Sequence, residues 1–115
     1  SSAQSDFNKM VRDSESFRKT AETLGLAPGS VHTIQTTFLV EEDGSITNIT
    51  ASSEYPQLEA EAIRIISTLP KIDLSDSGAP VHFPHTMKIP ITYRVETEAM
   101  KKLRLRKEAR RKKTN

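Results

Sequence analysis

The feature that most constrains the fold is a two-residue hydrophobic period next to an Asp-Gly pair. In Val31–Val40 most large apolar residues share one parity and polar residues occupy most of the other, which is typical of a strand with one buried face. Asp43-Gly44 follows, and glycine adopts the positive φ that a hairpin turn needs. Ile46–Ala51 is therefore predicted to be the second strand, antiparallel to the first. Ile46 and Ile49 are out of phase by one residue, so we expect either a bulge there or burial of both faces of the strand.

Two stretches show the three- and four-residue spacing of apolar side chains that is typical of an amphipathic helix. The first is Phe7–Leu24, with Ser5 or Asp6 as its expected N-cap and Gly25 at its end. We expect it to pack on the body of the protein, and pairing with another chain is the alternative. The second is Pro56–Leu69, whose apolar stripe consists of Leu58, Ala62, Ile65, Ile66 and Leu69.

The last third of the chain is predicted to hold a third strand and a charged helix. Val81–Val95 has the pattern of extended chain and is interrupted by Pro84 and Pro90. Since proline cannot donate a ladder hydrogen bond, each is expected at a bulge, a break or an unpaired edge. From Glu96 onward the residues favour a helix but few of them are apolar, so we expect a helical extension that frays before Asn115.

These elements predict an α+β fold in which a three-stranded antiparallel sheet packs on one helix, with extra N- and C-terminal helices. Because only three strands are present, the sheet is expected to keep two open edges. The expected organisation is an N-terminal helix and linker over residues 1–30, the sheet domain over 31–95, and a basic helical or disordered tail over 96–115.

Charge is distributed unevenly along the chain. Residues 1–95 carry eight Lys or Arg against twelve Asp or Glu, a balance of −4, whereas residues 96–115 carry nine against three, a balance of +6. The chain has no cysteine, which excludes disulfides and thiolate metal sites. No apolar run approaches the roughly 18 residues that cross a bilayer, so no membrane-spanning segment is expected.

The residue types of an active site are present, but not in a catalytic arrangement. His82 and His85 would point to opposite faces of an extended chain, and only Asp73 and Asp76 lie near them as further metal ligands. No serine lies in a Gly-x-Ser-x-Gly sequence, and the four glycines are scattered rather than gathered into a phosphate-binding loop. We therefore expect no enzyme activity, no metal and no cofactor.

Five short motifs follow one another between residues 34 and 95. They are Asp43-Gly44 with Ile46, Ile49 and Ser52-Ser53; Leu58-Glu59 with Ala62; Leu69-Pro70-Lys71; Gly78-Ala79-Pro80-Val81; and Ile89-Pro90-Ile91-Thr92-Tyr93. This ordered set resembles the TonB C-terminal domain family, whose hairpin, helix and last strand carry similar motifs. The N-terminal helix and the basic extension lie outside the resemblance.

The resemblance implies a periplasmic protein–protein interaction module of bacterial transport and energy transduction. Domains of this family are understood to add a short peptide of an outer-membrane receptor to the sheet edge along their last strand. A second copy of the chain could occupy the same edge, so peptide capture and homodimer formation both remain open. The positions expected to bind the partner are Ile91, Thr92, Tyr93, Arg94 and Val95.

The basic tail supports an alternative function, which is the binding of anions on nucleic acid or a membrane surface. Between Lys101 and Lys113 only Glu108 is acidic, and no aromatic residue is interleaved to stack on bases, so nucleic acid is not the main partner expected. A solvated helix without a ligand is the simplest interpretation of the same run. Its cations are Lys101, Lys102, Arg104, Arg106, Lys107, Arg110, Arg111, Lys112 and Lys113.

Overall fold

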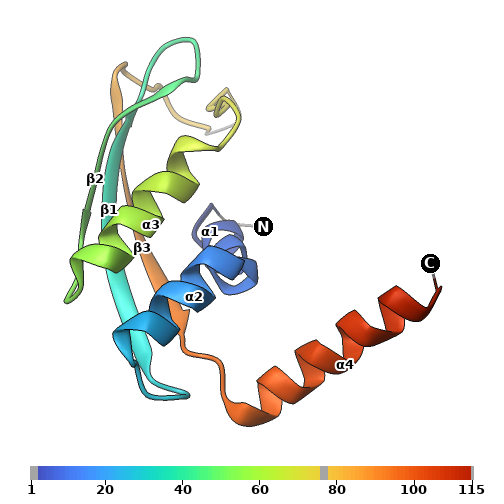
Figure 1. Ribbon diagram of the computed structural model, residues 1–115. Coiled ribbons are helices and arrows are strands. Elements are labelled where there is room, and N and C mark those ends of the chain that lie inside the picture. The colour runs from blue at the N-terminus through green and yellow to red at the C-terminus, as the bar shows by residue number, and fades with distance from the viewer. Residues whose placement is uncertain (1–2, 76–77, 115) are drawn as a thin grey trace.

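The computed structural model describes residues 3–75 and 78–114, which form one three-stranded antiparallel sheet in the order β2-β1-β3 and four helices (Figure 1). The strands are β1 (Val31–Val40), β2 (Ile46–Ser52) and β3 (His85–Arg94). The helices are α1 (Ala3–Asp13), α2 (Glu15–Leu24), α3 (Pro56–Ser67) and α4 (Glu98–Thr114). The predicted α+β class is confirmed, and so is the three-stranded antiparallel sheet packed against a helix.

The central strand, β1, pairs differently with its two neighbours. Its ladder with β3 covers ten consecutive residue pairs without a register shift. Its ladder with β2 shifts register between Thr37 and Leu39, and Asn48 in β2 adopts a positive φ of 51°. The expected bulge is therefore confirmed, and it allows Ile46 and Ile49 both to pack partly against the core.

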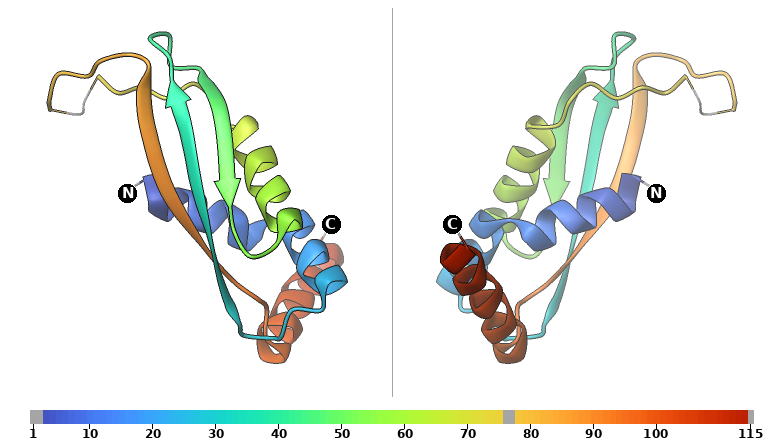
Figure 2. Two further views of the ribbon diagram at one scale, coloured as in Figure 1. Left: turned by 90° about the vertical axis from the view of Figure 1, so that its left-hand side faces the viewer. Right: turned by 90° about the vertical axis from the view of Figure 1, so that its right-hand side faces the viewer.

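One face of the sheet is covered by α1, α2 and α3, whereas no described residues cover the other face (Figures 1 and 2). Even-numbered residues of β1 and odd-numbered residues of β3 point into the covered side. Thr36 is the polar residue buried among them, and its Oγ1 donates a hydrogen bond to the Ile89 carbonyl at 2.6 Å. The core residues are Phe7, Val11, Phe17, Ala21, Ile34, Phe38, Val40, Leu58, Ala62, Ile65, Ile66, Ile89, Ile91, Tyr93 and Val95.

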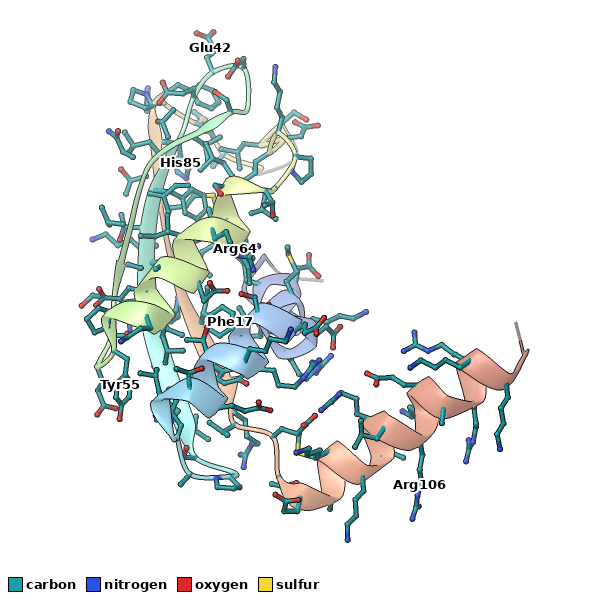
Figure 3. The ribbon with its side chains drawn as sticks, viewed as in Figure 1. Phe17, Glu42, Tyr55, Arg64, His85 and Arg106 are labelled. Carbon is teal, nitrogen blue, oxygen red and sulfur yellow. The ribbon has the colours of Figure 1, made fainter. Side chains whose placement is uncertain are left out.

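The N-terminal region forms two helices rather than the single Phe7–Leu24 helix expected from the sequence. Helix α1 ends at Asp13, and Ser14 caps α2 by accepting a hydrogen bond from the Phe17 N–H at 3.1 Å. The break lets α2 change direction and place Phe17 between the helices and the sheet, with its ring centroid 5.2 Å from that of Tyr93 (Figure 3). The apolar period continues through the break because both helices bury one side.

The first helix also starts earlier than expected. It begins at Ala3, so Ser5 and Asp6 lie inside its first turns and are not N-caps. Phe7 contacts Phe38 edge-on, with ring centroids 6.2 Å apart, and is only 4% exposed. The expected packing of the N-terminal segment on the body is therefore confirmed.

The hairpin turn is hydrogen-bonded to the loop that follows α3. Gly44 has a φ of 88°, and its carbonyl accepts a hydrogen bond from the Ile72 N–H at 2.8 Å. A Cβ at this position would lie 2.6 Å from the Ile72 carbonyl oxygen. The predicted turn at Asp43-Gly44 is confirmed, and its glycine is required by both backbone angle and space.

The third strand is shorter than the predicted Val81–Val95 segment. Pro84, whose peptide bond with Phe83 is cis, precedes β3, and the strand starts at His85. Pro90 lies within β3, at the sheet edge described below. The predicted helical extension is present as α4. It stays helical to Thr114, so the fraying expected before Asn115 is not found among the described residues.

We predict that Phe17→Ala lowers the free energy of unfolding by about 3–5 kcal/mol, because it empties a fully buried site between α2 and the sheet. Phe83→Ala removes the same atoms from a side chain that is 42% exposed, and should cost less than about 1 kcal/mol. Urea unfolding followed by circular dichroism measures both. Equal effects of the two substitutions would show that α2 does not belong to the cooperative core.

Candidate interaction surfaces

The first candidate surface is the outer edge of β3, because the strand order leaves β3 with a sheet neighbour on one side. The Thr92 N–H points away from β1, since it donates to Oδ1 of Asn8 in α1 at 2.9 Å. Backbone groups alternate in direction along an antiparallel strand. The N–H and C=O groups of Thr86 and Lys88, and the C=O of Pro90, therefore also point outward. At Pro90 no ladder bond is lost, because its missing N–H falls on the outer side.

The residues predicted to bind a partner, Ile91, Thr92, Tyr93, Arg94 and Val95, occupy the end of this edge and the residue after it. Three of them direct their side chains into the core and are at most 8% exposed. Burial raises the pKa of the Tyr93 hydroxyl, with Glu96 and Glu22 adding to this and Arg18 opposing it. Thr92 and Arg94 are exposed on the bare face of the sheet. In this region a partner would meet a backbone N–H that Asn8 already occupies.

The open part of the edge lies nearer the start of β3. In the described chain no hydrogen bond is made by the outward groups of Thr86 and Lys88. A pocket of about 510 Å³ lies at this end of the sheet, between the hairpin turn and the loop after α3. Its apolar lining comes from Ile72, Leu74, Val81 and Phe83, and its charged lining from Glu42, Asp43, Lys71 and Asp73. Hydrogen bonds from Ser45 lower the pKa of the Asp43 carboxyl, which also pairs with Lys71 at 3.6 Å.

The second candidate surface is α4, which carries all nine cations of the predicted anion-binding tail. Helix α4 does not pack against any other described helix or strand and projects from the body (Figures 1 and 2). Its apolar residues Met100, Leu103 and Leu105 are 38%, 51% and 47% exposed. Cations lie on all sides of the helix, and Arg106 points away from the body (Figure 3).

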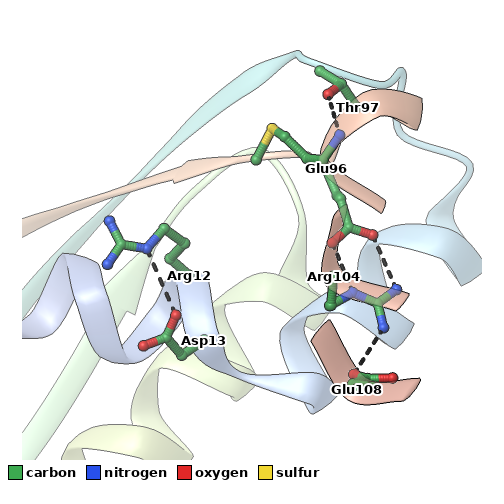
Figure 4. A network of polar contacts seen from close by, with 7 residues as sticks. Arg12, Asp13, Glu96, Thr97, Arg104 and Glu108 are labelled. Carbon is green, nitrogen blue, oxygen red and sulfur yellow. Dashed lines mark hydrogen bonds and ion pairs between the residues drawn. The ribbon is translucent and has the colours of Figure 1, made fainter. Parts of the chain in front are cut away.

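An ion cluster joins α4 to Glu96, which lies in the segment between β3 and α4 (Figure 4). Arg104 donates from Nε and Nη2 to the two carboxylate oxygens of Glu96, at 2.8 and 3.1 Å, and from Nη1 to Glu108 at 3.3 Å. This bidentate geometry is the strong form of an arginine–carboxylate pair. The hydrogen bonds from Arg104 lower the pKa of the Glu96 carboxyl, and Glu96 in turn raises the pKa of the Arg104 guanidinium.

A groove of about 730 Å³ separates α4 from the body. One wall is formed by Arg12, Asp13, Glu15, Arg18, Tyr93 and Arg94, and the other by Glu96, Met100, Leu103, Arg104, Lys107, Glu108 and Arg111. The α4 residues in this lining are spaced three or four apart and so share one side of the helix. The structure thus brings Arg104, Lys107 and Arg111 of the predicted set together with arginines of the body.

The histidines do not form a metal site. His32 contacts Oγ of Ser30 at 2.8 Å through Nε2 and lies edge-on to the ring of Tyr55, which fits a structural role. No cluster of three or more potential ligands occurs among the described residues; Asp76, one of the ligands considered above, lies outside them. No helix within residues 3–75 and 78–114 is long and apolar enough to cross a membrane.

Two functional features were not predicted from the sequence. The contact between Asn8 and Thr92 joins residues 84 positions apart, and nothing in the local pattern marks Asn8 as an edge cap. The pairing of Glu96 with Arg104 spans eight residues across the junction of strand and helix, outside the three- and four-residue spacing of helix pairs. No protein-family model matches the chain, and no curated protein or solved structure is significantly similar to it. Function therefore has to be argued from geometry.

We predict that amide hydrogen exchange distinguishes the two directions along β3. The N–H groups of Thr86 and Lys88 should exchange rapidly, whereas those of Ile89 and Ile91, which face β1, should be protected. The Thr92 N–H should be protected from exchange in the wild-type protein and should lose that protection in Asn8→Ala. It should stay protected in Asn8→Asp, since aspartate keeps the acceptor oxygen. Protection of Thr92 in Asn8→Ala would show that another group covers this edge.

We predict that the ion cluster fixes α4 only while Glu96 is ionised. A carboxyl whose pKa is lowered in the folded state contributes above its ordinary pKa, and the contribution is lost as the pH falls through the lowered value. Since the chain has no cysteine, spin labels on Lys19→Cys and Ala109→Cys report the distance between α2 and α4. The distance distribution should be narrow at neutral pH and broaden in acid.

Arg104→Gln should broaden the same distribution at neutral pH, because it removes the guanidinium that joins Glu96 and Glu108. Arg106→Gln is the matched control, since this arginine lies on the outer side of the same helix. If the distribution is equally narrow in Arg104→Gln, the cluster does not position α4.

Proposed function

We propose that this chain is a protein–protein interaction module that accepts an extended segment along the outer edge of β3, as the TonB-like resemblance suggests. The observation that carries the proposal is the pair of outward-facing residues Thr86 and Lys88, whose backbone groups make no hydrogen bond within the described chain. A strand added there continues the sheet without disturbing the core. The ladder between β1 and β3 has ten consecutive residue pairs without a register shift, so β3 offers a regular backbone for the added strand.

The energetics favour a weak to moderate interaction supported by side chains. Thr86 and Lys88 each offer a donor and an acceptor, and Pro90 offers an acceptor only. At about 1 kcal/mol net for each bond, such a ladder alone gives modest affinity after the cost of association. The pocket lined by Ile72, Val81 and Phe83 lies next to the start of β3 and supplies a place for an apolar side chain of the added strand.

The proposed binding position differs in part from residues 91–95. Asn8 engages the Thr92 N–H, so we place the added strand along His85–Pro90, with the 91–95 end accessible only when α1 moves. A peptide from a membrane receptor and a second copy of the chain would use the same groups. A periplasmic location is part of the proposal and is tested by fractionating cells that produce the natural gene product.

The test is Lys88→Pro, which removes one outward N–H and leaves the ladder with β1 intact, as Pro90 already does on the same strand. Lys88→Ala is the matched control, because it removes the same cation and keeps the N–H. We expect Lys88→Pro to weaken binding of extended peptides from a synthetic library, or dimer formation in sedimentation equilibrium, by about tenfold or more. Lys88→Ala should change either by less than about threefold.

Sedimentation equilibrium distinguishes a second copy of the chain from a bound peptide, since a homodimer gives a concentration-dependent mass in the absence of peptide. Circular dichroism of each variant shows whether the fold is retained, and Thr86→Pro with Thr86→Ala repeats the comparison at the next outward position. If every interaction is unchanged in both folded proline variants, the β3 edge is not the binding surface.

A further inference from the structure

The groove between α4 and the body has an excess of positive charge that the protein does not neutralise. Its lining contains six cationic and four acidic residues. Each acidic residue already has a cation within ion-pair distance: Asp13 pairs with Arg12, Glu15 with Lys19, and Glu96 and Glu108 with Arg104. Arg18, Arg94 and Lys107 have no carboxylate partner among the described residues. They come from α2, β3 and α4, so the uncompensated charge lies on both walls.

We infer that this groove binds an acidic segment of a partner protein, with its carboxylates between the two walls. Arginine recognises carboxylates with two parallel hydrogen bonds, and Arg18 of α2 and Lys107 of α4 line the groove from its two walls. The Arg94 guanidinium donates to the Gly29 carbonyl at 3.4 Å and is therefore a secondary contributor. Met100 and Leu103 line the same groove and are largely exposed, which suits an apolar side chain among the acidic ones. A volume of about 730 Å³ is in the range of ligand-binding clefts and leaves room for a few side chains of a bound segment.

The lining of the groove favours a peptide over other polyanions. A membrane surface or a nucleic acid duplex presents phosphates without apolar side chains, and the cations of α4 outside the groove lining would meet it as readily as those inside. Single-stranded nucleic acid requires aromatic rings on which bases stack. Tyr93 is the aromatic residue in the lining, but it is 4% exposed and packs on Phe17. An acidic, partly apolar protein segment satisfies both the charges and the apolar part of the lining.

The ion cluster of Arg104 gives the site its geometry. Arg104 is neutralised by Glu96, which directly follows Val95, and by Glu108, so it joins α4 to the segment that leaves the sheet and leaves Arg18 and Lys107 for the ligand. This surface is separate from the outer edge of β3 at Thr86 and Lys88. The inference therefore does not depend on strand addition, and the two fail independently.

The test uses a fluorescent synthetic peptide of glutamates around a central leucine, with anisotropy as the readout. We expect the full chain to bind it, and the double variant Arg18→Glu with Lys107→Glu to bind about tenfold more weakly or worse. The matched control is Lys102→Glu with Arg106→Glu, which makes the same change in net charge outside the groove lining. The control should bind within about threefold of wild type.

Two further arms decide between ligand classes. Unlabelled peptide should displace the probe better than a single-stranded oligonucleotide, duplex DNA or phosphatidylglycerol vesicles of equal total charge, and a glutamine version of the probe should not bind. The inference is overturned if both double variants lose affinity for the peptide equally, because the peptide would then bind the positive charge of α4 in general. It is also overturned if an oligonucleotide or the vesicles compete better than the peptide. Arg18→Gln with Lys107→Gln replaces the charge-reversed pair if that variant does not fold.

Discussion

The structure depends on burying one face of a narrow three-stranded sheet. Three strands cannot close on themselves, so the apolar side chains of β1 and β3 are buried only because helices cover them. Helix α3 alone covers the β2 side, and α1 and α2 extend the cover to β3 through Phe7 and Phe17. The N-terminal helices are therefore part of the core. The same arrangement leaves the opposite face and the outer edge of β3 to solvent.

That constraint explains why the two candidate surfaces differ in their chemistry. After Val95, whose N–H and C=O are held by Ser30 and Gly29 at 2.8 Å, the chain has passed the core and has few apolar residues to bury. Helix α4 consequently packs against no other described helix or strand, and its link to the residues after β3 is the ion pair of Arg104 with Glu96. The β3 edge offers directional backbone groups, and the α4 groove offers uncompensated cations. The two proposals therefore place an extended segment and an acidic segment of partner proteins at separate sites.

Much of the fold could be predicted from local patterns, and the exceptions have two causes. The limits of β1, the hairpin turn, the bulge near Asn48 and the stripe of α3 all follow from periodicity and turn chemistry within a few residues. The break at Ser14 was missed because the apolar spacing runs on through it, and a serine in a helical pattern is a weak signal. The edge contact of Asn8 and the Glu96–Arg104 cluster join segments whose approach depends on how the chain folds back.

The sequence by itself determined the α+β class, the side of β1 that is buried, the need for glycine in the hairpin turn, and the concentration of cations after residue 100, because each is a property of neighbouring residues. Only the tertiary structure decided that β3 lies at an edge, that Asn8 closes part of it, and that Arg18 and Lys107 line one groove. These are distances between residues far apart in the chain, and they are set by how helices pack over a sheet, which no local pattern contains.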